Sequence, residues 1–305
     1  MSASGSDYAL DHELARRRFD RSAAHARPLA VLELEIARRM SERLDYIRIA
    51  PARILDIGCG GGGDLDALGK RYPQARRVGI DFARGFLKSS DRQPGFLARL
   101  LAPKTSNAPA PLLTCADARA LPFAHARFEL IWSNLMLNWL TDPLPALREM
   151  HRTLAIDGLL MFSTLGPDTL KELRFALDDR VGAHVHRFID MHDIGDALVK
   201  AGFSDPVMDM EIITLTYADV DALLTDLRRS GWSNASTLRP RGLSGKSRWD
   251  AARTALQARF KDGRLPITFE IIQGHAWKAA PAKLEDGRAI MHFQPQRPPR
   301  PRNSP

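Results

Sequence analysis

The run Gly58-Cys59-Gly60-Gly61-Gly62-Gly63 constrains the fold of this chain more than any other feature, because it directly follows the strand-like residues Arg53 to Ile57. A strand that enters a helix through glycines brings backbone amides close to a ligand, where side chains would block the approach. We expect Gly58, Gly60 and Gly62 to contact that ligand. The spacing satisfies both GxGxG and GxGxxG, so it predicts a nucleotide-binding turn and leaves the class of nucleotide open.

Short β-rich runs alternate with helical runs through the middle of the chain, which is the pattern of βαβ units and of a parallel sheet. The runs between residues 53 and 166 include RILDIG, GDLDALGKRY, RRVGID, LLTCADA, FELIWSN, PALREMHRTL and GLLMFSTLG. Two later strand-like runs, PVMDMEIITLTY and PITFEIIQGHAWK, match the closing pair of such a sheet. We therefore predict a doubly wound α/β fold with a mostly parallel, seven-stranded, Rossmann-like sheet.

The domain organisation follows from length and patterning. With 305 residues, of which 44% are hydrophobic, the chain can bury one substantial core. We predict a flexible N-terminus at 1–13, and apolar residues at helical spacing then predict N-terminal helices over 14–50 that act as a lid. The catalytic domain is expected at 51–280, with a surface insertion at 91–111, where Pro and Ala interrupt the pattern.

The charge of the chain suggests the chemistry of a partner. A formal charge of +8 and a pI near 9.8 predict an acidic partner, which leaves nucleic acid, an anionic surface and an acidic carrier protein open. Part of the excess lies in residues 281–305, whose Pro and Arg content predicts a disordered basic tail. Nucleic acid is the less favoured partner, because no RNA-binding module can be recognised.

Cysteine usage and hydropathy indicate the compartment. Cys59 and Cys115 lie in elements predicted to be buried and lack metal-ligand spacing, so we expect packing residues, no disulfide framework and no metal site. No apolar run approaches the roughly 20 residues of a membrane-spanning helix, and the first dozen residues lack the pattern of a secretory signal. We predict a cytoplasmic protein.

Three carboxylates at the ends of predicted strands favour a cationic nucleoside over a dinucleotide. Asp56 lies two residues before the first glycine and is expected beside the ammonium group of an amino-acid portion. Asp81 ends the second strand, where it can accept hydrogen bonds from both ribose hydroxyls. Asp117 follows the third strand and is expected to accept from an adenine amino group, while Ala118 offers its backbone N–H to the ring.

Each of these carboxylates taken alone is often only a helix cap or a turn former. All three in register, with no Arg or Lys in the loop to bind phosphates, predict S-adenosylmethionine as the cofactor. Asn134, at the end of the fourth strand, is expected to meet the sulfonium end through its backbone, although a plain turn residue is an alternative.

The chain resembles the class I methyltransferases, and more closely the family of malonyl-(acyl-carrier protein) O-methyltransferases of biotin synthesis. DIGCG, ALPF, FELIWSN and DGLLMFSTLG are shared by many methyltransferases and imply only the fold and the cofactor. Five further segments resemble the narrower family: FDRSAAHA, FSTLGPDTLKELR, HRFIDMHDIGDALVKAGF, PVMDME and TFEIIQGHAWK. The resemblance extends from about Phe19 to Lys278.

The resemblance implies methyl transfer to the free carboxylate of a malonyl group carried on an acidic acyl-carrier protein. That carboxylate is already ionised near neutral pH, so alignment and exclusion of water matter more than a general base. Arg174 is the predicted catalytic residue, because a guanidinium can grip a carboxylate or a thioester carbonyl with fixed geometry. A salt bridge from Arg174 to Asp178 at helical spacing is the alternative.

Four residues are predicted to bind the acceptor. Asp168 and Thr169 follow the fifth strand, where N-capping of the next helix is the alternative role. His192 is expected to border the acceptor pocket, and Trp139 to pack against the methionine moiety or the pantetheine arm, with core packing as its alternative.

The chain also departs from the family pattern. Ala26 stands where many members have an active-site tyrosine, Glu129 where Asp is commoner, and Asn138 where several relatives have His. A second branch with the GxDTLxELR element, the mitochondrial complex I assembly factor, is described as an arginine hydroxylase. A hydroxylase-like relative, a methyltransferase with another acceptor and a non-catalytic assembly protein that binds S-adenosylmethionine are therefore the alternatives.

Overall fold

The computed structural model describes residues 9–24, 30–90, 110–177, 183–242 and 245–280. Predictions for Ala26, Asp178, most of the insertion at 91–111 and the tail at 281–305 lie outside these ranges. Within them we find no helix with the length and apolarity needed to span a bilayer.

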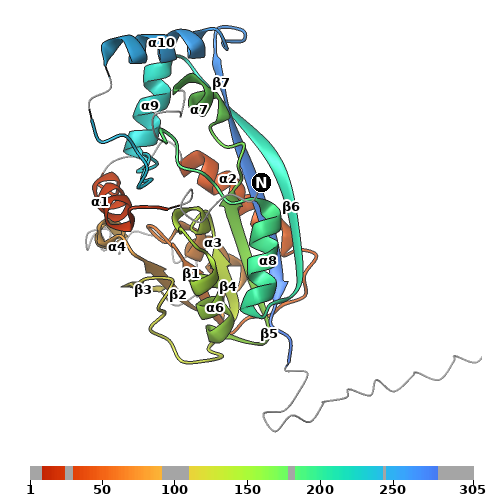
Figure 1. Ribbon diagram of the computed structural model, residues 1–305. Helices are drawn as coiled ribbons and strands as arrows, with labels where there is room; N and C mark the ends of the chain where they lie inside the picture. Colours follow the sequence, from red (N-terminus) through yellow and green to blue (C-terminus); the bar gives the residue numbers. More distant parts are fainter. Residues whose placement is uncertain (1–8, 25–29, 91–109, 178–182, 243–244, 281–305) are drawn as a thin grey trace, which may run out of the picture.

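Seven strands form a single sheet in the order β3-β2-β1-β4-β5-β7-β6 (Figure 1). They are β1 (Arg53–Ile57), β2 (Arg76–Asp81), β3 (Leu112–Cys115), β4 (Phe128–Ser133), β5 (Leu154–Leu165), β6 (Ser204–Tyr217) and β7 (Leu265–Trp277). The pairs among β1 to β5 are parallel, whereas β7 runs antiparallel to both β5 and β6. This confirms the predicted doubly wound, mostly parallel, seven-stranded fold.

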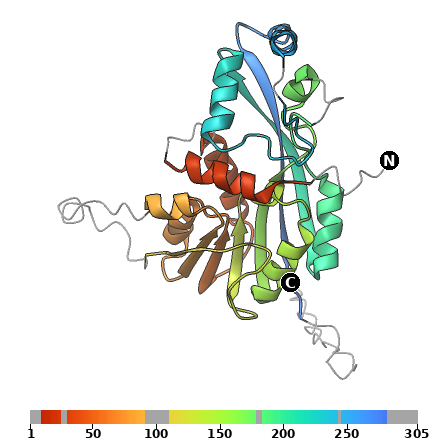
Figure 2. The same ribbon diagram turned by 60° about the vertical axis from the view of Figure 1, so that its left-hand side comes forward.

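Helices cover both faces of the sheet (Figure 2). The helices are α1 (His12–Ser22), α2 (Ala30–Arg43), α3 (Gly63–Arg71), α4 (Arg84–Ser90), η1 (Leu137–Trp139), α6 (Leu144–Thr153), α7 (Lys171–Leu177), α8 (Met191–Ala201), α9 (Val220–Arg229) and α10 (Lys246–Gln257). The long strands β6 and β7 extend past the parallel strands, and α7, α9 and α10 lie around their far end (Figure 1).

Alternation along the central strands produces two hydrophobic clusters. Ile54 of β1 packs into the cluster that includes Ile36 of α2, and its neighbour Leu55 packs into the cluster that includes Leu147 of α6 and Leu198 of α8. All five side chains are fully buried. Each such burial contributes about 1.5–3 kcal/mol, so the sheet is stabilised from both sides.

Local sequence explains the ends of several helices. The Asp11 carboxylate accepts from the backbone N–H of Leu14 at 3.0 Å and caps α1, so residues 9–13 of the segment predicted to be flexible are part of the fold. Asp219 caps α9 in the same way. Gly202 ends α8 at a φ of 99°, a left-handed conformation that glycine adopts without strain.

One expectation for the fold needs correction, and one helix was not predicted. Cys115 is exposed at the end of the edge strand β3, whereas Cys59 is buried as predicted. The sequence patterns did not predict helix α10. Its only buried residues are Ala252 and Leu256, which left too weak an apolar pattern to predict it.

Candidate functional site

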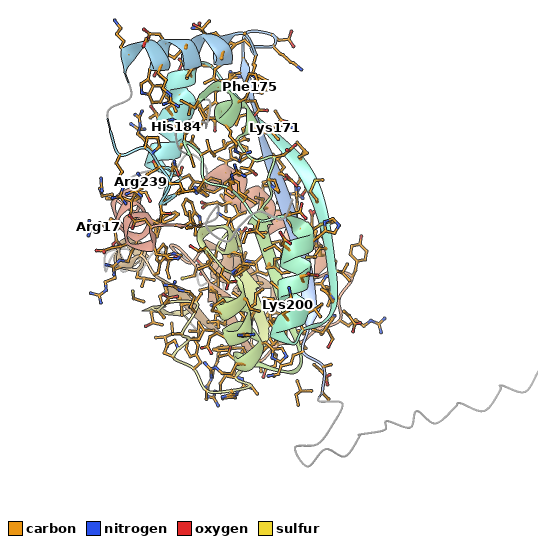
Figure 3. All side chains as sticks on the ribbon, in the orientation of Figure 1. Arg17, Lys171, Phe175, His184, Lys200 and Arg239 are labelled. Atoms are coloured by element: carbon orange, nitrogen blue, oxygen red, sulfur yellow. The ribbon has the colours of Figure 1, made fainter. Side chains whose placement is uncertain are left out.

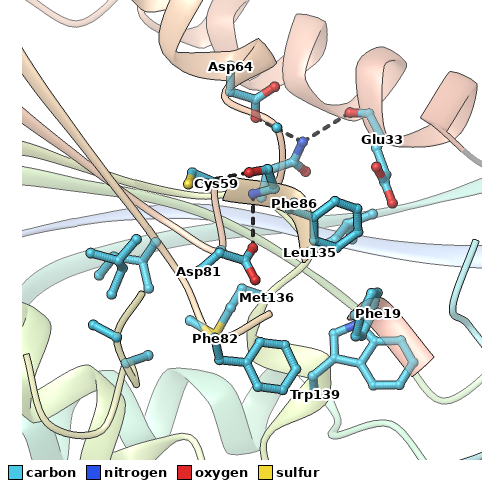
Figure 4. A pocket seen from close by; sticks show the side chains of 18 of the residues that line it. Phe19, Glu33, Cys59, Asp64, Asp81, Phe82, Phe86, Leu135, Met136 and Trp139 are labelled. Carbon is cyan, nitrogen blue, oxygen red and sulfur yellow. Dashed lines mark hydrogen bonds between the residues drawn. The ribbon is translucent and has the colours of Figure 1, made fainter. Parts of the chain in front are cut away.

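A cavity of about 270 Å³ lies at the carboxyl ends of the parallel strands (Figure 4). In doubly wound folds this edge of the sheet is the usual place for a ligand. The lining residues that the site uses are Gly58, Gly60, Asp64, Asp81, Asp117, Ala118, Arg119 and Asn134 from the sheet side, and His12, Phe19, Glu33, Leu34, Trp139 and Trp232 from the other side.

The glycine turn is shaped by its neighbours as well as by its own backbone. The amides of Gly58 and Cys59 both donate to the carbonyl of Ile80, at 2.8 and 3.0 Å. Gly58 has a φ of 83°, and a Cβ atom built on it would lie 2.7 Å from the Cβ of Met136. Only glycine fits this position, because a side chain would combine backbone strain with a collision.

Asp81 fixes the turn from the end of β2. One carboxylate oxygen accepts from the N–H of Gly60 at 2.9 Å, and the other accepts from the N–H of Ala83 at 2.8 Å. These contacts hold the carboxylate at the cavity wall, and its role in binding ribose stays a prediction.

Asp117 and Ala118 also line the cavity, on the segment after β3. The Asp117 carboxylate accepts from the backbone N–H of Arg119 at 2.9 Å and from its guanidinium at 2.6 to 3.2 Å. These hydrogen bonds lower the pKa of Asp117 below its ordinary value. Arg119 was not predicted, and it neutralises the carboxylate expected to bind adenine.

The Asn134 side chain joins several elements around the cavity. Its Nδ2 donates to the carbonyl of Glu33 at 3.0 Å and to the carboxylate of Asp64 at 3.1 Å. Its Oδ1 accepts from the hydroxyl of Ser163 at 2.8 Å. Asn134 therefore connects β4 with α2, α3 and β5, in addition to its predicted place on the wall.

Asp56 lies beneath the turn and is not among the residues that line the cavity, and neither is Gly62. The Asp56 side chain is 1% exposed, and its Oδ2 has no hydrogen-bond partner among the described residues. Burial, and then the nearby Asp64 and Asp81, raise the pKa of Asp56 well above its ordinary value. Asp56 therefore lies off the cavity wall, and its contact with a ligand stays a prediction.

The lid side of the cavity is mostly aromatic. The ring of Phe19, on α1, packs edge-on against Trp139 with a centroid distance of 4.8 Å. It also contacts Phe82 at 5.9 Å and Phe86 at 6.1 Å (Figure 4). Helices α1 and α2 both contribute wall residues, and their predicted action as a lid stays a prediction.

Four residues predicted for the acceptor do not line the cavity: Arg174, Asp168, Thr169 and His192. The Arg174 guanidinium donates to the carbonyls of Pro167 at 2.8 Å and Thr169 at 3.1 Å. Thr169 is fully buried and exchanges hydrogen bonds with the backbone of Glu270 on β7.

The other two predicted acceptor residues point to solvent. Asp168 forms an exposed ion pair with Lys171 at 2.7 Å. The His192 side chain is 89% exposed and lies 2.8 Å from the N-capping Asp190, away from the cavity.

His186 connects the cavity wall to Arg174. Its buried ring contacts Trp139 at a centroid distance of 5.1 Å and Phe188 at 4.6 Å. Burial, with the positive charges of Arg174 and Arg18, lowers the pKa of His186 to about 4, so the imidazole is neutral at physiological pH. Among the described residues its Nε2 has no hydrogen-bond partner.

The described ranges contain no group of three or more His, Cys, Asp or Glu residues that could hold a metal ion.

Comparison with known proteins identifies the family. A methyltransferase domain model matches residues 55–162. A malonyl-(acyl-carrier protein) O-methyltransferase of Laribacter hongkongensis is 49% identical over 298 residues, which cover 95% of this chain and 98% of the relative. The protein of the same name from Gallionella capsiferriformans is 44% identical, over 93% of this chain and 97% of its own.

This chain belongs to the malonyl-(acyl-carrier protein) O-methyltransferase family. The crystal structure of the YcgJ protein from Bacillus subtilis is similar in fold, with a TM-score of 0.53 and 16% sequence identity over 80% of this chain and 99% of that one.

Two departures of this chain from the pattern of its family have a structural explanation. Glu129 accepts from the backbone N–H of Arg53 at 2.7 Å and pairs with its guanidinium, so the longer carboxylate anchors the start of β1. With its amide turned to satisfy both partners, Asn138 donates to the carbonyl of Leu135 at 2.9 Å and accepts from the indole N–H of Trp139 at 3.0 Å. Asn138 thus orients a wall residue without reaching the cavity itself.

Proposed function

We infer that this protein transfers a methyl group from S-adenosylmethionine to the free carboxylate of a malonyl group carried on an acyl-carrier protein, a step in biotin synthesis. The observation that carries the inference is similarity along nearly the whole chain to relatives named for this reaction. The methyltransferase domain alone covers only residues 55–162. The remaining similarity includes the segments that form the lid and the acceptor side.

The chemistry of the cavity fits this cofactor. Asp56, Asp64 and Asp81 lie close enough together that burial and the two neighbouring carboxylates raise the pKa of Asp56. A cation bound at the turn would offset that repulsion, which suits a ligand with an ammonium and a sulfonium group. We propose that Gly58 and Gly60 bind the cofactor through the turn backbone.

The remaining cofactor contacts are proposed at the strand ends, with each residue in its predicted role. Asp81 accepts from the ribose hydroxyls, Asp117 from the adenine amino group, and Ala118 donates its N–H to the ring. Asn134 positions the sulfonium end.

The bound cofactor supplies an electrophilic methyl group on a positively charged sulfur. The residues of this chain then need to align an anionic oxygen and to keep water out. The aromatic wall of Phe19, Phe82, Phe86 and Trp139 provides a dry surface in which the attraction between carboxylate and sulfonium is strong. No general base is required, because a malonyl carboxylate is ionised near neutral pH.

The acceptor needs a positive counter-charge, and we propose that Arg174 provides it. Its side chain lies beyond His186, which contacts the wall residue Trp139. We also propose three further acceptor-binding residues, Asp168, Thr169 and His192. The side chain of each would have to move toward the cavity to reach the acceptor. Trp139 needs no such movement, because it already lines the wall.

We further propose that the carrier protein is acidic and docks on the lid side of the molecule in the cytoplasm. The charge of +8 supports an acidic partner. Arg17 and Arg239 lie on this side (Figure 3), but each already forms an ion pair, with Glu13 and Asp11 respectively. We propose four further exposed basic residues for the docking surface: Arg228, Arg229, Arg241 and Lys246.

Transfer of labelled methyl from S-adenosylmethionine to malonyl-carrier protein tests the function. Acetyl-carrier protein and a free malonyl thioester are the controls. We expect rapid labelling of the malonyl carrier only. No labelling, with S-adenosylhomocysteine still bound in calorimetry, would contradict the assigned acceptor and favour a hydroxylase-like or non-catalytic relative.

The Arg174→Ala variant tests the acceptor role. Loss of a charged hydrogen bond costs about 1.5–3 kcal/mol, so we expect transfer to fall by about ten- to a hundredfold. Lys171→Ala, on the same helix with a side chain that is 48% exposed, should change transfer less than about twofold. Unchanged affinity for S-adenosylhomocysteine would show that the cofactor site has kept its fold. Equal rates for the two variants would exclude Arg174 from the acceptor site.

A further inference from the structure

Asp64 is an acidic residue on the cavity wall for which the sequence predicted no role. It lies in the first turn of α3, directly after the glycine turn. A carboxylate in the first turn of a helix is stabilised, because the unpaired N–H groups of that turn carry partial positive charge.

The Asp64 carboxylate is held in one orientation by two donors from β4 and its end. Its Oδ2 accepts from the indole N–H of Trp132 at 2.8 Å. The same oxygen accepts from Nδ2 of Asn134 at 3.1 Å (Figure 4). Within the described part of the chain, no hydrogen bond reaches Oδ1. Burial raises the pKa of Asp64, against the opposing effect of its two donors. A cation bound at Oδ1 would compensate that burial.

Three other acidic side chains near the glycine turn have surroundings different from those of Asp64. Asp81 uses both oxygens on the backbone amides of Gly60 and Ala83. Asp117 uses both of its oxygens on Arg119. Asp56 lies under the turn, away from the wall. Of these four carboxylates, Asp64 alone combines a fixed orientation with an oxygen that has no hydrogen bond from the described residues.

We infer that Asp64 is the carboxylate that binds the ammonium group in the amino-acid portion of the cofactor. This inference rests on the proposed function for the identity of the cofactor. It moves the ammonium contact from the strand end to α3 and leaves Asp56 buried off the cavity wall. Asn134 then has a positioning role, because its amide bridges Asp64 and the carbonyl of Glu33 on α2.

Binding of S-adenosylhomocysteine and of its analogue without the amino group tests the assignment by calorimetry. An ammonium-carboxylate contact that is shielded from water contributes about 2–3 kcal/mol, so the wild-type protein should prefer S-adenosylhomocysteine by about thirtyfold or more. In Asp64→Asn this preference should fall below about threefold, through weaker binding of S-adenosylhomocysteine.

Asp66→Asn is the matched control, because Asp66 lies on the same helix with a side chain that is 72% exposed. It should keep the wild-type preference. An unchanged preference in Asp64→Asn, an equal loss of affinity for both ligands, or loss of the preference in Asp56→Asn or Glu33→Gln would each overturn the assignment. Absence of S-adenosylhomocysteine binding by the wild-type protein would overturn the proposed function, and this assignment with it. The measurement needs no carrier protein, so failure of the acceptor assignment leaves it unaffected.

Discussion

The two walls of the cavity are built in different ways. On the sheet side, Gly58 and Asp81 are held by backbone hydrogen bonds between neighbouring strands and their turns. On the lid side, Phe19 is held by ring contacts with residues such as Trp139. Hydrogen-bonded backbone is specific in distance and angle, whereas ring packing tolerates small shifts. We therefore expect the sheet wall to recognise one constant ligand and the lid wall to adjust to the acceptor.

The sheet wall should tolerate substitution least, and Gly58→Ala tests this. A φ of 83° and a Cβ atom 2.7 Å from Met136 should together cost about 3 kcal/mol or more of unfolding free energy. Gly61→Ala is the control in the same turn, because its added Cβ would have no neighbour within 4 Å. Urea unfolding of both variants measures the difference. Similar stabilities would contradict a rigid sheet wall.

The buried His186, behind the lid wall, should make the free energy of unfolding depend on pH. Its folded pKa of about 4 lies below the ordinary 6.5, so the unfolded chain binds the extra proton first as the pH falls. Stability should decrease between about pH 6.5 and pH 4, and by about 2 kcal/mol between pH 7.5 and pH 5.

His186→Phe should remove this part of the decrease. Urea unfolding at pH 7.5 and pH 5 would measure it, with the wild-type protein losing about 2 kcal/mol more than the variant. The same loss in both proteins would mean that other groups determine the acid sensitivity.

The smallest effect is expected at Phe19. Phe19→Leu removes the edge-on contact with Trp139 but retains an apolar side chain, so methyl transfer should fall by roughly three- to tenfold. The affinity for S-adenosylhomocysteine should change by less than about threefold, since the sheet wall is intact. Arg17→Ala, on the solvent side of α1, should leave the affinity for S-adenosylhomocysteine unchanged. A loss of cofactor affinity as large as the loss of rate would remove the distinction between the two walls.

Local patterns in the sequence predicted most of the sheet wall. Asp81, Asp117 and Asn134 follow strands whose ends must meet at one edge of a parallel sheet, so their placement needed no long-range information. Asp64 also had a local signal, an acidic residue in the first helical turn after the glycines, but the strand-end pattern drew attention to Asp56.

The lid wall could not be predicted in the same detail. The contacts of Phe19 and Trp232 depend on how distant segments pack, which periodicity does not encode. The acceptor-side residues show the same limit. Thr169 and Arg174 lie close to the strand end in sequence, yet the hydrogen bonds of the turn and of β7 orient them away from the cavity.

The pairing of β6 with β7 has a consequence for the evolution of acceptor choice. Tyr217 and Leu265 are direct partners in the two strands, so the segment 218–264 leaves the sheet and returns to it at adjacent positions. Exchange of this segment between homologues would leave the strand pairing in place, provided that its buried residues, such as Leu223 and Trp232, still fit the shared core. The segment contributes Trp232 to the wall, and Ser236 pairs with Leu10 beside the lid. Chimaeras that swap it test whether this segment sets the choice of acceptor independently of the methyl donor.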